Sequence, residues 1–394
     1  MDLEKLICKR TAEMKPSGIR RFFDIANEME GVVSLGVGEP DFKTPYAIRR
    51  AAIDNLQRGN TRYTANSGLM ELRKAISDYM RERFTLEYDP THEIMVTVGG
   101  SEGIDLAVRA FIEEGDEVLI PEPSYVAYAP IVSLTFGVPV PIPLKEENNF
   151  RLTAEELEAA ITPKTKMLML PFPNNPTGSI MRREHLEAIA EVLRRHDNIV
   201  VVSDEIYAEL TYNGRHVSIA ELPDMWERTI IIGGFSKAFS MTGWRLGYLC
   251  APPAALSQML KIHQYALMCS PTTSQWGGVE ALRNCIDSIT AMRDEYNLRR
   301  RFVVDEFNRM GLHTFEPEGA FYVFPCIKST GLTSEKFCEK LLYSKKIAVV
   351  PGDAFGASGE GFIRVSYCYS VNHLTAAVKG ISEFLDDLRN GRIE

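Results

Sequence analysis

The feature of this sequence that most constrains its fold is a series of five short apolar runs in the middle of the chain. Segments with helical periodicity lie between them, such as SEGIDLAVRAFIEE and REHLEAIAEVLRRH. Near-continuous apolar strands that alternate with helices predict a mostly parallel sheet with helices on both faces. In sheets of this kind, ligands bind where strands end and loops begin. The five runs are IMVTV at 94–98, EVLIP at 117–121, KMLML at 166–170, NIVVVS at 198–203 and TIIIG at 229–233.

The two ends of the chain differ from the centre in their pattern of apolar and charged residues. With 394 residues the chain is longer than a domain with a single hydrophobic core usually is, so two or three structural units are expected. From about residue 290 a long charged helical segment leads to GAFYVFP, KIAVVPG and GFIRVSY, which predicts a smaller α+β unit with two or three strands. The first 45 residues hold no comparable strand run. We therefore expect a large domain at 46–288 and a small domain made from 1–45 and 289–394.

Charge and cysteine usage exclude several classes of protein. A formal net charge of −9 argues against nucleic acid or an anionic membrane as the main partner. No uncharged apolar run approaches the roughly 20 residues that a membrane helix needs, and the start MDLEKLICKRTAEMK lacks the apolar core of a signal peptide. Seven cysteines without a CxxC pair indicate reduced thiols in a cytoplasmic protein, and the scattered histidines predict no metal site.

Two of the predicted strands end in loops with displayed polar groups. GGSEG follows the run at 94–98 and opens a helix, whose first backbone N–H groups and dipole favour a phosphate. PFPNNPTG follows the run at 166–170 and presents two asparagines on a rigid turn. Taken singly, each loop is more often structural, as a tight strand–helix turn or a loop-forming Asn-Pro pair.

Two further strands end in ionisable side chains. Asp204, Glu205 and Tyr207 follow the run at 198–203, and an acid at the end of a buried strand needs a cationic partner or several donors. Ser236 and Lys237 follow the run at 229–233, with Arg245 eight residues beyond. A lone lysine in such a place is usually solvated. Together, however, these loops bring a phosphate cradle, an amide, an acid, a phenol, a lysine and an arginine to one sheet edge. Pyridoxal phosphate, a cationic and planar cofactor with an aldehyde, matches all of these groups.

Seven motifs in fixed order resemble fold-type I aminotransferases of class I/II. The resemblance runs from about residue 15 to 385 and is closest to the prokaryotic subgroup of archaeal aromatic and thermophilic aspartate aminotransferases. It implies an α/β fold with a large domain, whose mostly parallel seven-stranded sheet is flanked by helices, and a smaller α+β domain from both chain ends. The motifs are SLGVGEPDFKTP, RYTANSGLMELRKAI, NNPTG, SDEIY, FSKAFSMTGWRLGY, EGAFYVFP and GFIRVSY.

The resemblance also implies roles for individual residues toward the cofactor. Lys237 stands at the position of the Schiff-base lysine, Asp204 at the acid paired with the pyridine nitrogen, and Tyr207 at the phenol that donates to the ring's 3-hydroxyl oxygen. Asn175 matches an amide on that same oxygen. The phosphate contacts implied are the backbone at Gly100, Ser101 and Glu102, then Ser236 and Arg245, and Tyr63 from a neighbouring subunit; Tyr125 matches the aromatic stacked on the ring.

Substrate contacts follow from the same resemblance. Arg364 matches the arginine that grips the substrate α-carboxylate, assisted by Asn175 and the backbone of Gly38. From the alternation in GFIRVSY alone, Arg364 is equally a solvated edge residue. Ser101 occupies a position where some relatives that favour aspartate have a lysine. Ile19 falls near the expected side-chain pocket, and we expect a preference for aromatic or apolar amino acids.

The expected activity is transfer of an amino group from an L-amino acid to a 2-oxo acid such as 2-oxoglutarate, with ping-pong kinetics. A homodimer with shared active sites is expected, without nucleic acid or membrane partners. An aspartate or N-acetyl-diaminopimelate aminotransferase, or a C–S β-lyase on the same fold, stays open. A cofactor-sensing domain that controls transcription is a remote alternative, because no helix-turn-helix pattern fits the chain.

Overall fold

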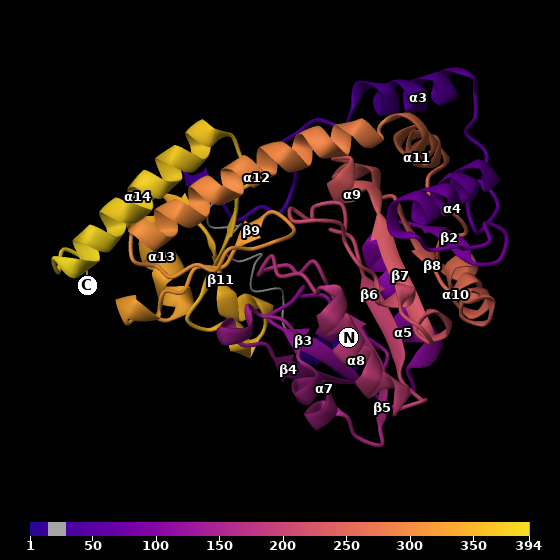
Figure 1. Cartoon of the computed structure of the whole chain (residues 1–394), viewed down its shortest axis with the longest axis horizontal. Helices are drawn as coiled ribbons and strands as arrows, with labels where there is room; N and C mark the ends of the chain where they lie inside the picture. The colour runs from indigo at the N-terminus through magenta and orange to yellow at the C-terminus, as the bar shows by residue number, and fades with distance from the viewer. Residues whose placement is uncertain (15–28, 394) are drawn as a thin grey trace.

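The largest element of the protein is a seven-stranded sheet (Figure 1). The computed structural model describes residues 1–14 and 29–393. Strand β8 is antiparallel to both of its neighbours, and the other strand pairs are parallel. Across the sheet the order is β2 (Ile94–Thr97), β8 (Gly247–Cys250), β7 (Thr229–Gly234), β6 (Val200–Asp204), β5 (Thr165–Leu170), β3 (Glu117–Glu122) and β4 (Val138–Pro143).

All five strands predicted from apolar runs are present, with boundaries within two residues of those expected. The two strands without such a run are β4 and β8. Strand β4 reads VPVPIP and pairs only with β3 at the edge of the sheet. Its prolines alternate, so the N–H groups that they lack point to the unpaired side. An edge position therefore accommodates a sequence that would break a central strand.

Helices cover both faces of this sheet, as the alternation of side chains in buried strands requires. One face packs against α5 (Gly100–Phe111), α6 (Tyr128–Leu134) and α10 (Pro253–Ala266). The opposite face packs against the remaining helices of this body. These are α4 (Met70–Phe84), α7 (Ala154–Ala160), α8 (Arg183–Arg194) and α11 (Thr272–Asn284), with α3 (Tyr46–Gln57) packed on α11.

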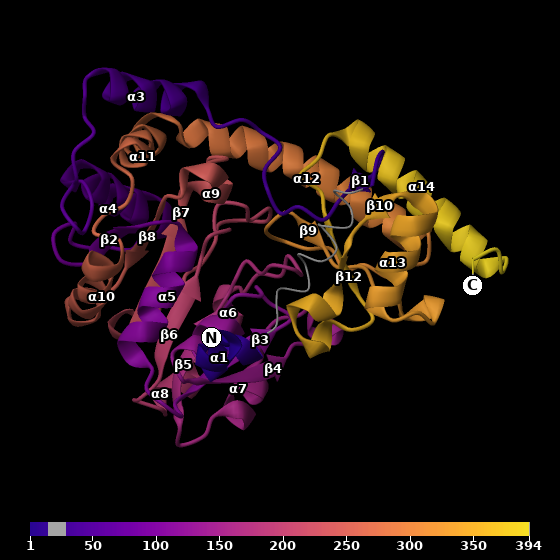
Figure 2. The same cartoon turned by 180° about the vertical axis from the view of Figure 1, so that it is seen from behind.

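A second body with its own core combines the C-terminal part of the chain with an early segment that includes Val33, Leu35 and Phe42, whereas α1 (Lys9–Glu13) lies against α6 of the first body. Strand β1 (Val33–Ser34) pairs in parallel with β10 (Ile347–Ala348), which joins an early segment to a late one. The long helix α12 (Ile286–Arg309) runs from the first body along the second (Figures 1 and 2). The other elements here are β9 (Tyr322–Val323), α13 (Ser334–Lys345), β11 (Val350–Pro351), β12 (Ile363–Ser366) and α14 (Val371–Arg389).

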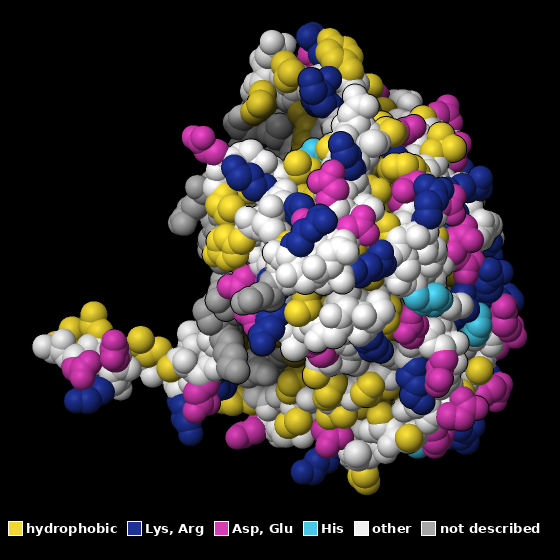
Figure 3. All heavy atoms as spheres, turned by 90° about the vertical axis from the view of Figure 1, so that its left-hand side faces the viewer, with side chains coloured by type: hydrophobic (Ala, Val, Ile, Leu, Met, Phe, Trp, Pro, Cys, Tyr) yellow, Lys and Arg dark blue, Asp and Glu magenta, His cyan; other side chains and the backbone are white. Residues whose placement is uncertain are grey.

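The predicted α/β fold with a mostly parallel seven-stranded sheet is confirmed. The exact domain limits at 45/46 and 288/289 stay a prediction. No helix in the described ranges is long and apolar enough to cross a membrane. On the face seen in Figure 3, basic and acidic side chains are interspersed, so this face presents no single-signed field that would attract a polyanion.

Candidate active site

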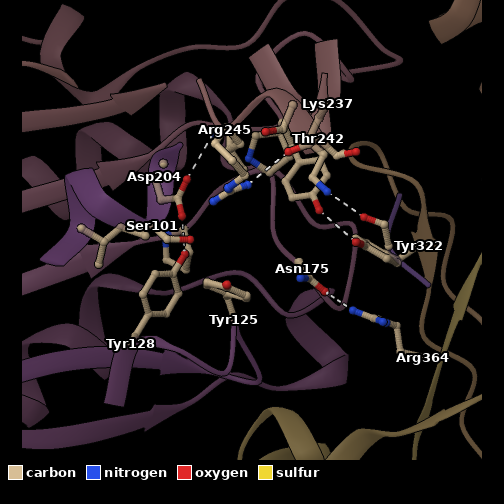
Figure 4. Close-up of a pocket in the computed structure, with 18 residues that line it drawn as sticks. Ser101, Tyr125, Tyr128, Asn175, Asp204, Lys237, Thr242, Arg245, Tyr322 and Arg364 are labelled. Atoms are coloured by element: carbon tan, nitrogen blue, oxygen red, sulfur yellow. Dashed lines mark hydrogen bonds between the residues drawn. The ribbon is translucent and has the colours of Figure 1, made fainter. Parts of the chain in front are cut away.

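A cavity of about 340 Å³ opens at the loop ends of the central strands. Side chains from both bodies line it and point toward one another (Figure 4). Glu102 and Tyr63 do not line it, and Ile19 lies outside the described residues. The predicted site residues that the fold brings together here are Gly38, Gly100, Ser101, Tyr125, Asn175, Asp204, Tyr207, Ser236, Lys237, Arg245 and Arg364.

One corner of the cavity is built for an anion. Helix α5 starts here, and its first N–H groups have no partner within the helix. Gly99 precedes the helix with a φ of +77°, and a Cβ at that position would lie 2.7 Å from Arg245 Nη2. Glycine therefore lets the arginine approach the loop closely. The side chain of Ser236 and the first turn at Ser101 complete this corner.

The carboxylate of Glu102 faces away from the cavity. It accepts a hydrogen bond from the backbone N–H of Val98 and contacts Nδ1 of the fully buried His263 on α10. The side chain of Glu102 is therefore not available to the cavity, and the predicted phosphate contact through its backbone N–H, in the first turn of α5, stays a prediction. The side chain ties the loop before α5 to a neighbouring helix.

Asp204 provides a buried carboxylate at the end of β6. Only 8% of the residue is exposed. Tyr128 Oη donates to Asp204 Oδ2 at 2.6 Å, and the N–H of Ile206 donates to Oδ1 at 3.2 Å. Burial raises the pKa of Asp204, although these two hydrogen bonds act in the opposite direction. A buried acid of this kind is stabilised in its charged form by a cation, which a protonated ring nitrogen supplies.

Tyr128 is a site residue that the sequence interpretation missed. It lies three residues after Tyr125 in EPSYVAY, and the two rings meet edge to face with centroids 5.6 Å apart. The sequence interpretation gives a role only to Tyr125, the first of these two tyrosines. Tyr128 could have been predicted from a helix that starts near this point, because two residues three positions apart lie on the same side of a helix.

Lys237 lies directly after β7, in the short helix α9 (Phe235–Ala238). Its Nζ donates to the carbonyl oxygen of Gly38 at 2.6 Å and lies 5.8 Å from the ring centroid of Tyr207. The residue is partly open to the cavity, but protein surrounds the amine. This burial lowers the pKa of Lys237 to about 8. A lysine amine near neutrality can act both as a nucleophile and as a base.

Arg364 is a buried cation with a free donor. The residue is 4% exposed, because β12 is the middle strand of its three-stranded sheet. The alternative that it is a solvated edge residue is therefore wrong. Its guanidinium donates to Asn175 Oδ1 at 3.0 Å and to the carbonyl oxygen of Gly36, whereas its buried Nε has no partner among the described residues. An unused guanidinium donor suits a carboxylate.

Tyr207 and Tyr322 face each other within the cavity. Their hydroxyl oxygens are 2.9 Å apart, and both residues are buried. Tyr322 is a second residue that the sequence interpretation missed, although it lies in the quoted motif EGAFYVFP. Burial raises the pKa of Tyr322 to about 12, so its hydroxyl keeps its proton at neutral pH.

A family model described as aminotransferase class I and II matches residues 30–381. The chain is a class I and II aminotransferase. It is 46% identical over 375 residues to the aspartate aminotransferase of Pyrococcus abyssi, with 94% of this chain and 96% of that one covered. It is 43% identical over 381 residues to aromatic-amino-acid aminotransferase 2 of Thermococcus litoralis, with 96% and 98% covered.

The fold of this aminotransferase is shared with solved structures. The aspartate aminotransferase of Thermus thermophilus with maleate superposes with a TM-score of 0.91 at 35% identity, over 96% of this chain and 99% of that chain. Enzymes of this family use pyridoxal 5'-phosphate. The cavity fits that group, because an anion corner, a buried carboxylate and a lysine amine of lowered pKa line the same space. In the described part of the chain, no group of three or more His, Cys, Asp or Glu residues could hold a metal ion.

Proposed function

We propose that this aminotransferase prefers aromatic or apolar L-amino acids as donors and a 2-oxo acid such as 2-oxoglutarate as acceptor, with ping-pong kinetics. The observation that carries this proposal is the pairing of two groups in one cavity. Lys237 has a pKa of about 8, and the buried Nε of Arg364 has no partner among the described residues. The first can take a proton from the α-carbon of a bound amino acid, and the second can hold the carboxylate of that amino acid.

The chain's own residues have separate tasks toward the cofactor. When bound, the cofactor supplies an aldehyde that joins to amines and a ring that accepts electrons. Asp204 would keep the ring nitrogen protonated, and Tyr207 and Asn175 would bind the ring's oxygen. Tyr125 would pack against the ring. Ser236, Arg245 and the backbone at Gly100, Ser101 and Glu102 would hold the phosphate.

Toward the substrate, binding and proton movement are divided between the two bodies. Arg364 holds the α-carboxylate with Asn175 and the backbone of Gly38. The Nζ atom of Lys237 would take the proton from the α-carbon and deliver it to the carbon of the cofactor that carried the aldehyde, as its pKa of about 8 allows. A 2-oxo acid leaves before the second substrate enters, which is the basis of the ping-pong order.

The donor preference rests on what lines the rest of the cavity. The cations in its described lining are Lys237, Arg245 and Arg364, and each already has a task. None is left for a second carboxylate in the side chain of a substrate. Of the apolar side chains in the lining, Ile206 is partly exposed, whereas Ile104 is 2% exposed. The relatives do not decide the donor, because proteins named for aspartate and for aromatic amino acids match at similar identity.

An amino-donor panel with 2-oxoglutarate tests this preference. We expect kcat/KM for phenylalanine, tyrosine or leucine to exceed that for aspartate by about tenfold or more, which is the order of discrimination that an apolar pocket provides. The highest value for aspartate or N-acetyl-diaminopimelate would contradict the proposal. Pyruvate and ammonia from cystathionine, without a 2-oxo acid from any donor, would identify a lyase. Cofactor binding without any turnover would favour a sensor.

We also propose a homodimer in which Tyr63 reaches the phosphate in the partner subunit. Tyr63 is 79% exposed and lies outside the cavity of its own chain. Its loop is held in place, since Thr272 Oγ1 donates to the carbonyl oxygen of Arg62 at 2.8 Å. Tyr265 and Met268 precede Thr272 and are also exposed. An exposed aromatic residue on a fixed loop is suited to insertion into a second subunit.

Subunit mixing tests the shared site. We combine Lys237→Ala with Tyr63→Ala, two variants that each damage a different component. If sites are shared, a mixed dimer has one site with both defects and one intact site, so activity should rise to about a quarter of the native value in a random mixture. Tyr265→Ala mixed with Lys237→Ala serves as a control for surface effects. Activity equal to the sum of the separate variants would reject the shared site, and sedimentation of the native protein as a monomer would reject the dimer.

A further inference from the structure

Two buried tyrosine hydroxyls meet where the two bodies face each other. Tyr207 follows β6 of the seven-stranded sheet, and Tyr322 begins β9 of the three-stranded sheet. Their oxygens are 2.9 Å apart, and Figure 4 shows Tyr322 among the residues that line the cavity. The residues are 5% and 1% exposed. Each hydroxyl must therefore form its hydrogen bonds inside the protein or with a molecule bound in the cavity.

The hydrogen-bonding capacity of a hydroxyl fixes the direction of this contact. A tyrosine has one proton to donate and lone pairs that accept. If Tyr207 donates to the cofactor oxygen, as the proposed function requires, its proton is used. The contact with Tyr322 then persists only if Tyr322 donates to Tyr207. Burial raises the pKa of both groups, so both keep their protons at neutral pH.

We propose that Tyr322 is a positioning residue, which donates to Tyr207 Oη and thereby directs the proton of Tyr207 at the cofactor oxygen. The proposal rests on the proposed role of Tyr207. Hydrogen bonds in a chain polarise one another, so a hydroxyl that accepts becomes a stronger donor. Tyr322 thus acts on the cofactor through Tyr207, from the other body of the protein.

The surroundings of Tyr322 fix its hydroxyl in place. The guanidinium carbon of Arg364 lies 4.6 Å from the centroid of its ring. A Cβ at Gly38 would lie 2.1 Å from Tyr322 Oη, so this segment approaches the hydroxyl only because residue 38 has no side chain. The carbonyl of the same glycine accepts from Lys237 at 2.6 Å. One tyrosine therefore contacts the carboxylate-binding arginine, the segment that orients the lysine, and Tyr207.

Tyr322→Phe tests the proposal, because it removes the hydroxyl and keeps the ring against Arg364. The visible absorbance of the bound cofactor changes with pH, and we expect the midpoint of that change to rise by roughly 0.5 pH unit. Weaker donation to the cofactor oxygen favours the more protonated form. We expect kcat to fall severalfold and KM for the amino acid to change less than twofold. Tyr88→Phe is the matched control, since Tyr88 is 3% exposed, has no hydrogen-bond partner among the described residues and does not line the cavity.

A double variant separates action through Tyr207 from any other effect. In a Tyr207→Phe background, Tyr322→Phe should leave the midpoint where the single Tyr207→Phe variant has it. An equal shift in both backgrounds would show that Tyr322 acts independently and would overturn the proposal. No shift in the native background, with an unchanged melting temperature, would also overturn it. A native protein that binds no cofactor would instead refute the proposed function.

Discussion

Lys237→Ala is expected to lower turnover by roughly a millionfold, the order seen when a catalytic nucleophile is removed. The alanine variant lacks the amine that we propose bonds to the cofactor and acts as the base toward the α-proton. The variant should also lose the visible absorbance of a lysine-bound cofactor. Because the amine is a buried cation with a pKa lowered to about 8, its removal should not lower the melting temperature of the protein without cofactor.

The pH dependence of cofactor capture gives a second measurement on the same lysine. Only the neutral amine attacks an aldehyde, and the neutral fraction rises as pH passes upward through the pKa. The rate of capture by native protein without cofactor should therefore rise through a midpoint near pH 8. An ordinary surface lysine would place this midpoint above 10. Lys261→Ala on α10 is the control and should behave as the native protein does. Native turnover by the Lys237→Ala variant would contradict the assignment.

The fold could be predicted from the sequence where the residues of a strand form a continuous apolar run. Each of the five apolar runs is buried on both faces of the central sheet, so nearly every position had to be apolar. Strand β4 has no such signal, because an edge position permits three prolines in VPVPIP. Strand β8 is only four residues long, and its first two residues are the last two of the motif FSKAFSMTGWRLGY, so no separate apolar run marks it.

The site could be predicted where chemistry follows directly after a strand. Asp204 and Lys237 do so, and both line the cavity. Tyr128 and Tyr322 could not be found in this way, because their importance lies in a partner that only the tertiary structure provides. Tyr128 meets Asp204 from a position 76 residues earlier, and Tyr322 meets Tyr207 from 115 residues later. The burial of Arg364 likewise depends on neighbouring strands that local alternation does not reveal.

Asp204→Asn is the second large effect that we expect, with kcat/KM lower by about a thousandfold or more. Asparagine has nearly the same shape: its Oδ1 can accept from the N–H of Ile206, and its Nδ2 can donate to Tyr128 Oη, so both contacts can be kept with the direction of one reversed. It cannot carry the negative charge that holds a proton on the ring nitrogen. Burial raises the pKa of Asp204, so its ionised form opposes folding of the protein without cofactor at neutral pH. The variant should therefore be at least as stable as the native protein to urea when cofactor is absent.

Glu205 provides a matched control for this substitution, because it is the next residue along the chain and is 6% exposed. Its carboxylate accepts from Ser203 Oγ at 2.8 Å and lies 3.0 Å from His216 Nε2, and it does not line the cavity. Glu205→Gln should lower stability by disturbing this buried network, while kcat/KM falls less than about tenfold. Activity and stability would thus respond oppositely to two neighbouring acids. Loss of activity with Glu205→Gln and native activity with Asp204→Asn would reverse the assignment of the acid that pairs with the ring nitrogen.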